Sequence, residues 1–312
     1  MKYTSKDAMI FMWIITNVGG YMIKKEDSLG IPNYGMHYLK MPLERNSIED
    51  TLEEFLGIHN FINQIASSNT VPEFQGKQKR LQFINYGSTQ LVYVLTIDEN
   101  RQYTFLVNQP ATQFGIGRRE FENLRILSKN NRDNVVSPLY YFSDKNSTNI
   151  ELYVTPYYYQ SRCIGVEDKE WGVWIPEPEY LFYEFKPQDK KIINASMVAL
   201  LVKLYDDKEK RGLSEVRLDG GDFMIEKGFE DYDINFENVL KRMKLIAARK
   251  LEPMELDEYI SRIRQELSGK VTDNREVKVI GKMLKKPLEV DEIEDGIKLG
   301  LVLRERERGR EK

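Results

Sequence analysis

The chain has 312 residues, of which 41% are hydrophobic and 30% charged, so it can fold around one large core or two smaller ones. Its 46 basic and 49 acidic residues give a net charge of −3, which does not favour nucleic acid as the default partner. A single cysteine, Cys163, excludes an intrachain disulfide and a cysteine-rich zinc site, and we expect a cytoplasmic protein.

Residues 1–76 predict a mostly helical N-terminal extension. The run Ala8–Thr16 is apolar but too short to span a bilayer, and no signal-peptide cleavage pattern follows it, so we expect a buried helix and no membrane partner. Ser47 and Asp50 are spaced like a capping box ahead of apolar residues at helical spacing. The apolar surface of this extension either covers the next part of the chain or meets a protein partner.

From Leu81 the pattern changes to one that predicts strands. Residues 81–110 contain two or three strand-like runs, which we expect to form an antiparallel meander. An amphipathic helix is predicted within residues 114–134, and two further strands within 135–144 and 150–159. The expected order is therefore strand, strand, strand, helix, strand, strand.

The later part of the chain is expected to be mainly helical. Tryptophans and prolines in residues 163–191 are typical of irregular chain, so a long ordered connector is predicted there. A helix is expected from about Ile193 to Tyr205. Three or four more helices are predicted within Phe236 to about Lys250, Leu256 to Leu267, Val277 to Leu284 and Val290 to Leu303.

Three short stretches carry groups suited to phosphate or metal binding. "NYGSTQLVYVL", residues 85–95, places small residues between two predicted strands, where backbone N–H groups can approach a phosphate closely. "RLDGGDFMI", residues 217–225, places two acids and a glycine pair ahead of an apolar strand, and "FEDYDIN", residues 229–235, adds further acids. Glycine and aspartate are also common in ordinary turns, so each stretch has a purely structural interpretation.

Together, these stretches and the order of elements resemble the protein-kinase-like fold, especially its aminoglycoside-phosphotransferase branch. The resemblance covers about Leu81 to Asn238. It implies an α+β, two-lobed protein with a β-rich N-lobe at residues 77–159 and a mainly helical C-lobe at residues 160–312, preceded by the helical extension. ATP and Mg²⁺ are the cofactors that such a protein would bind.

The resemblance also assigns nucleotide-binding positions in the β-rich lobe. Gly87, Ser88 and Thr89 occupy the turn that covers the phosphates in the family, and Tyr157 lies at the link between lobes, where an adenine would stack. Glu120 is the helix acid that would pair with a lysine of the third strand. That strand carries Asn108 or Gln109 in the lysine's neighbourhood, so the usual phosphate-neutralising cation is missing. Arg118 and Arg119 are candidates to replace its charge, although from a different element.

The catalytic loop of the family maps onto "RLDGGDFMI". Asp222 stands at the position of a metal-binding asparagine and can ligate Mg²⁺, and Asp231 is the candidate second metal ligand. Arg217 stands where the family carries its catalytic aspartate, and a guanidinium cannot accept a proton. Asp219, two residues on, is the candidate substitute base.

Two function classes follow from these departures. The missing lysine and the missing catalytic aspartate favour a pseudokinase-type binding or scaffold protein in which nucleotide binding is retained or lost. The alternative is a divergent phosphotransferase that uses ATP and Mg²⁺ on an unidentified substrate. Whether the protein is an enzyme is left open by the sequence.

Overall fold

The protein was examined in a computed structural model. It describes residues 58, 60–68, 71–76, 78–86, 90–108, 114–144, 150–157, 161–175, 181–216, 218, 220–226, 228, 233–269 and 286–310. The chain divides into two compact units, which are described separately. The first comprises Met1–Arg118 and Pro138–Tyr157, and the second Arg119–Ser137 and Tyr158–Lys312. Antiparallel sheets and helices occur together, so the predicted α+β class is confirmed.

A five-stranded antiparallel sheet forms the first unit. Its strands lie in the order β1-β2-β3-β5-β4. They are β1 (Lys79–Tyr86), β2 (Gln90–Ile97), β3 (Arg101–Asn108), β4 (Tyr140–Asp144) and β5 (Ile150–Pro156). Helix α4 (Ile116–Asn130) follows β3 in the chain. The predicted order of three strands, a helix and two strands is therefore confirmed.

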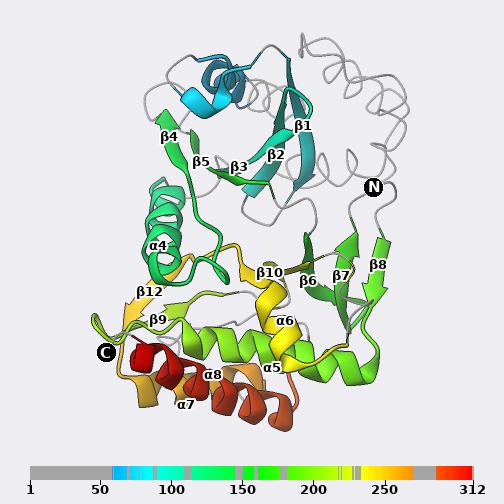
Figure 1. Cartoon of the computed structure of the whole chain (residues 1–312), viewed down its shortest axis with the longest axis vertical. Coiled ribbons are helices and arrows are strands. Elements are labelled where there is room, and N and C mark those ends of the chain that lie inside the picture. The colour runs from blue at the N-terminus through cyan, green and yellow to red at the C-terminus, as the bar shows by residue number, and fades with distance from the viewer. Residues whose placement is uncertain are drawn as a thin grey trace, which may run out of the picture. The chain divides into compact units, whose positions relative to one another are not determined.

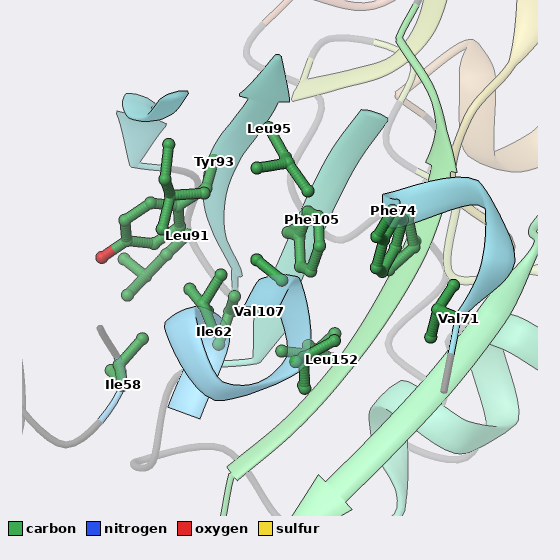
Figure 2. Close-up of a cluster of buried hydrophobic side chains, with 14 of the residues drawn as sticks. Ile58, Ile62, Val71, Phe74, Leu91, Tyr93, Leu95, Phe105, Val107 and Leu152 are labelled. Atoms are coloured by element: carbon green, nitrogen blue, oxygen red, sulfur yellow. The ribbon is translucent and has the colours of Figure 1, made fainter. Parts of the chain in front are cut away.

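One face of this sheet is covered by chain that precedes it. Residues 60–67 are helical, and the 3₁₀ turn η1 (Pro72–Phe74) follows them. Figure 2 shows Ile62 and Phe74 against the side chains of β2, β3 and β5, and both are fully buried. The ring centroids of Phe74 and Phe105 are 5.5 Å apart. The described part of the predicted N-terminal extension thus packs on the sheet, whereas residues 1–57 lie outside the described residues.

The second unit combines helices with two antiparallel sheets (Figure 1). The larger sheet has the order β11-β10-β6-β7-β8, and β12 pairs with β9. The strands of the two sheets are β6 (Ser161–Glu167), β7 (Glu170–Ile175), β8 (Leu181–Glu184), β9 (Arg211–Ser214), β10 (Gly220–Glu226), β11 (Met243–Leu245) and β12 (Lys250–Pro253). Its remaining helices are α5 (Pro187–Lys203), α6 (Phe236–Arg242), α7 (Leu256–Leu267) and α8 (Val290–Arg310).

The predicted irregular connector is wrong, because residues 161–184 contribute strands β6, β7 and β8. The two-residue turn between β6 and β7 consists of Asp168 and Lys169, both with positive φ (47° and 69°). Such turns favour Asn-Gly, so an Asp-Lys turn gives no hairpin signal in the sequence. Helix α6 also ends earlier than predicted, since residues 243–245 pair with β10 instead. The helix expected at 277–284 lies outside the described residues.

Helix α5 is the centre of the second unit, and α8 packs along it in the same direction. Ten consecutive residues of α5, Ile193–Val202, are buried. Gly296 and Gly300 of α8 lie against it, and a Cβ on Gly296 would stand 2.5 Å from the carbonyl oxygen of Ala195. Only residues without a side chain permit this approach, so the two glycines set the spacing of the helices.

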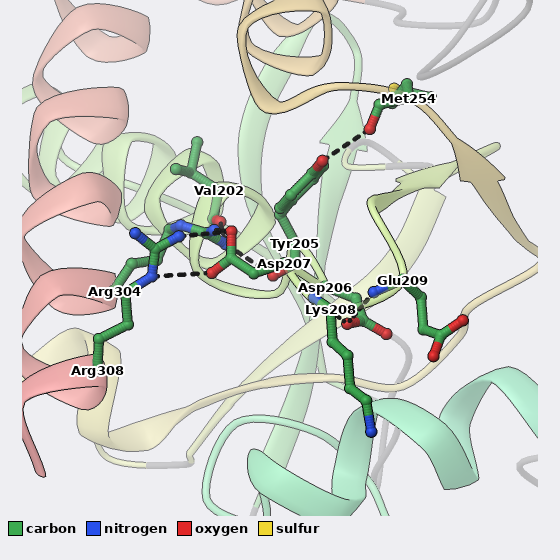
Figure 3. Close-up of polar contacts among 9 residues, drawn as sticks. All are labelled: Val202, Tyr205, Asp206, Asp207, Lys208, Glu209, Met254, Arg304 and Arg308. Carbon is green, nitrogen blue, oxygen red and sulfur yellow. Dashed lines mark hydrogen bonds and ion pairs between the residues drawn. The ribbon is translucent and has the colours of Figure 1, made fainter. Parts of the chain in front are cut away.

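Arg304 of α8 caps the carboxyl end of α5 (Figure 3). Its Nη1 donates to the carbonyl oxygens of Val202 and Tyr205 at 3.1 and 2.7 Å. Its Nη2 pairs with Asp207, which also accepts from Arg308. The last carbonyls of a helix carry partial negative charge and have no hydrogen-bond donor within the helix. A buried guanidinium there donates to them, and its own N–H groups thereby gain acceptors.

Glu292 makes a buried polar contact at the other end of this helix pair. One carboxylate oxygen accepts from the backbone N–H of Glu289 at 3.0 Å and from Nδ2 of Asn194 at 3.2 Å. Burial raises the pKa of Glu292, against the opposing effect of these two hydrogen bonds. The Oδ1 of Asn194 has no hydrogen-bond partner among the described residues, so a protonated Glu292 would have an acceptor nearby.

Among the described residues, no helix combines the length and the apolar composition that crossing a bilayer requires.

Replacing Gly296 should separate α8 from α5. We expect Gly296→Ala to lower the free energy of unfolding by about 1–3 kcal/mol, because the added methyl group meets backbone. Gly309→Ala in the same helix is the matched control: its Cβ would meet nothing within 4 Å, so stability should be unchanged or rise by up to about 1 kcal/mol. Urea unfolding of both variants measures the difference, and equal effects would contradict the close approach.

Glu292→Gln should change the pH dependence of stability. A raised carboxyl pKa means that the folded protein holds the proton above the ordinary value of 4.5, so wild-type stability falls as pH rises through the folded pKa. The variant lacks this loss, and its advantage should therefore grow towards neutral pH. Glu294→Gln is the control, since Arg264 lowers the pKa of Glu294 and the sign reverses. The measurement is the urea unfolding midpoint of each variant from pH 4 to 8. The same pH dependence in both variants would contradict the raised pKa of Glu292.

Candidate functional site

Asp222 lies on β10 and is engaged by an arginine. Its side chain is 3% exposed, and Arg249 contacts both carboxylate oxygens. The Nη2 atom donates to Oδ1 at 2.7 Å, and Nη1 pairs with Oδ2. Such a two-point contact between guanidinium and carboxylate fixes geometry as well as charge. The carboxylate predicted to bind Mg²⁺ therefore already has an internal cation.

Arg249 also contacts the chain just before β10, which was predicted from the sequence to be a catalytic loop. Its Nη1 donates to the carbonyl oxygen of Glu215 at 3.0 Å. Glu215 has φ of 59°, a left-handed conformation that is uncommon for a residue with a side chain. Val216 and Leu218, which flank Arg217, are fully buried. The guanidinium thus joins the start of this loop to the strand that follows it.

The glycine pair before Asp222 has a conformational role. Gly221 has φ of 86°, and the pairing of β10 with β6 is irregular between Gly220 and Met224. A Cβ on Gly221 would lie 3.6 Å from Cβ of Cys163, so space is adequate and the backbone conformation is what requires glycine. The irregular pairing turns the strand at the point where Asp222 meets Arg249.

Cys163 borders this ion pair on β6. Burial raises the pKa of its thiol to about 11, and the negative charge of Asp222 adds to the shift. At neutral pH the sulfur is therefore protonated and weakly nucleophilic. Its position suits packing beside the acid rather than covalent chemistry.

The end of β3 carries an amide where the family resemblance calls for a lysine. Asn108 is buried, and its Oδ1 accepts from Nε2 of Gln90 on β2 at 3.2 Å. Its Nδ2 has no hydrogen-bond partner among the described residues. Asn108 supplies no positive charge, so this position could not neutralise a phosphate.

A buried carboxylate of β5 holds the start of α4, which the sequence did not indicate. Glu151 accepts from the backbone N–H groups of Gly115 and Gly117 at 2.7 and 3.3 Å. The hydroxyl of Tyr141 donates to its other oxygen. Helix N-termini attract negative charge because their first N–H groups have no partner in the helix. Glu151 fills that role from 34 residues away along the chain, counted to Gly117.

The predicted site residues fall into two groups. Those described are Glu120, which is buried on α4, Tyr157, whose backbone N–H donates to Gln102, and Asp222. Those outside the described residues are Gly87, Ser88, Thr89, Asp219 and Asp231. The proposed pairing of Asp222 with Asp231 around one ion is thus untested. Within the described part of the chain, no group of three or more His, Cys, Asp or Glu residues could hold a metal.

Compared with models of known protein families the chain matches none, and a search of curated proteins finds no similar sequence.

Arg249→Met should destabilise the protein because it leaves Asp222 buried without its cation. Breaking a buried pair from one side costs about 3–5 kcal/mol. The matched variant Asp222→Asn/Arg249→Met removes both charges and should recover most of that loss, apart from the hydrogen bond to Glu215. Unfolding free energies in urea measure both, and a single variant as stable as the wild type would contradict a structural ion pair.

Proposed function

We propose that this chain is a two-lobed, kinase-like protein that works as a binding or scaffold protein and transfers no phosphate. The kinase-like part of the proposal is supported by the order of elements and by the antiparallel sheet that carries β1 to β5. The absence of catalysis is supported most directly by one contact, the two-point ion pair of Asp222 with Arg249.

This ion pair competes with a metal for the same oxygens. Mg²⁺ binds through carboxylate oxygens and demands near-octahedral geometry, whereas both oxygens of Asp222 already accept from one guanidinium. A cation at Arg249 would also repel an incoming divalent ion over a few ångströms in a site with little water. Asp222 is therefore better suited to hold two segments together than to ligate a metal.

Two other positions point the same way. Asn108 cannot neutralise phosphate charge, and Arg217 cannot act as a base because its guanidinium stays protonated at working pH. Removing either group from a phosphotransferase normally costs orders of magnitude in rate, since both act on charge in the transition state. Binding of ATP at Gly87, Ser88, Thr89 and Tyr157, with no Mg²⁺ held by Asp222, remains the ligand chemistry that this proposal allows.

A phosphate-release assay with ATP and Mg²⁺ tests the proposal. We expect no turnover above that of buffer, and no gain from Arg217→Asp alone, because Arg249 still occupies Asp222. Magnesium-dependent turnover by the wild type that Asp222→Asn abolishes would overturn it and favour the divergent phosphotransferase.

The same preparation shows whether a nucleotide binds. A rise in melting temperature on adding ATP identifies retained nucleotide binding. Repeating the measurement on Asp222→Ala/Asp231→Ala then tells whether the acidic pair contributes. Equal shifts with Mg²⁺ and with EDTA are expected, because Asp222 is neutralised within the protein.

A further inference from the structure

The exposed side of α4 and the turn after it carry a cluster of cations in the second unit. We name it the α4 basic face, and it consists of Arg119, Arg125, Lys129 and Arg132, all exposed. Ile126 lies among them with 41% of its surface exposed, one of the larger apolar side chains on the described surface. Residues 119, 125, 126 and 129 share one side of the helix by their spacing. The acid on this side is Glu122.

These four cations make no ion pair or side-chain hydrogen bond with any described residue. Some exposed cations elsewhere in the same unit do, since Arg264 pairs with Glu294 and Lys191 pairs with Asp291. Lys208 and Arg306 are exposed without such a pair among the described residues, so the α4 basic face is distinguished by the clustering of its cations. The chain as a whole is slightly acidic, so the cluster is a local departure from the average surface. An uncompensated group of like charges attracts anions.

Helix stability does not explain the position of Arg119. It stands in the first turn of α4, which contains no acid, and a cation near a helix N-terminus is unfavourable by a few tenths of a kcal/mol to about 1 kcal/mol. The N–H groups of Gly115 and Gly117 at this end of the helix donate to Glu151, which lies far away along the chain. Lys129, in the last turn, does favour the helix dipole, so its charge has a structural explanation.

We propose that the α4 basic face binds an acidic, amphipathic segment of a partner protein, with an apolar side chain of that segment against Ile126. The helical residues 119–130 span about 17 Å at 1.5 Å per residue, which suits three turns of a partner helix. A nucleic acid fits this face less well. Proteins that bind nucleic acids neutralise many phosphates or stack bases on aromatic rings, whereas this face has few cations and no exposed aromatic ring. The proposal does not depend on the kinase-like assignment.

Fluorescence anisotropy with the full chain tests this surface. The probe is a labelled 16-residue amphipathic helix with glutamates on one side and leucines on the other. Arg119→Glu/Arg125→Glu should raise its Kd about tenfold or more, which corresponds to about 1.4 kcal/mol. The matched control, Lys208→Glu/Arg306→Glu, changes net charge equally at exposed positions and should leave the Kd within about twofold of the wild type.

Two further arms separate the alternatives. Ile126→Ser should weaken the leucine peptide but not a serine-substituted peptide of equal charge, because only the former has an apolar side chain to bury. Circular dichroism and melting temperature confirm that each variant folds. Equal Kd values for the α4 and control variants, no binding of the peptide, or tighter binding of a 20-base-pair DNA that depends on Arg119 and Arg125 would each overturn the proposal.

Discussion

The second unit depends on how one buried carboxylate is neutralised. Asp222 lies on β10, which hydrogen-bonds to β6 on one side and β11 on the other, so its side chain leaves water when the sheet forms. An isolated buried charge costs several kcal/mol, and Arg249 offsets that cost from the chain just before β12. Because the same guanidinium binds the Glu215 carbonyl, strand and loop fix each other.

Two other buried acids, Glu151 and Glu292, are stabilised without such an arginine, and the groups that contact each acid determine its role. Glu151 accepts from two backbone N–H groups at the start of α4, so it sets where that helix begins. Among the described residues Glu292 receives two hydrogen bonds and forms no salt bridge, and burial raises its pKa. Asp222 is contacted at both carboxylate oxygens by Arg249 and is the least available of the three for binding a ligand.

Local patterns predicted much of the fold but little of the site. The helix at Leu256–Leu267 was predicted with its observed bounds, because its apolar spacing and the glycine that follows are local signals. The strands in residues 161–184 were missed, since prolines and an Asp-Lys turn hid the hairpin. Arg249 lies 27 residues from Asp222, and no spacing rule links an acid to a cation across a sheet. A pairing partner is chosen by tertiary structure, so the chemistry of Asp222 could not be predicted from its motif alone.

The surface cations of the second unit can also be compared by whether an acid pairs with them. On α8, Arg304 and Arg308 share Asp207 at the end of α5 (Figure 3), so folding alone accounts for their positions. The four cations of the α4 basic face have no such acid among the described residues, and Arg119 is unfavourable for the helix dipole. An exposed cation with no acid opposite it among the described residues is accessible to an acidic partner. Under the proposal that Asp222 is held by Arg249 and binds no metal, recognition of a partner is the activity that these surface charges can serve.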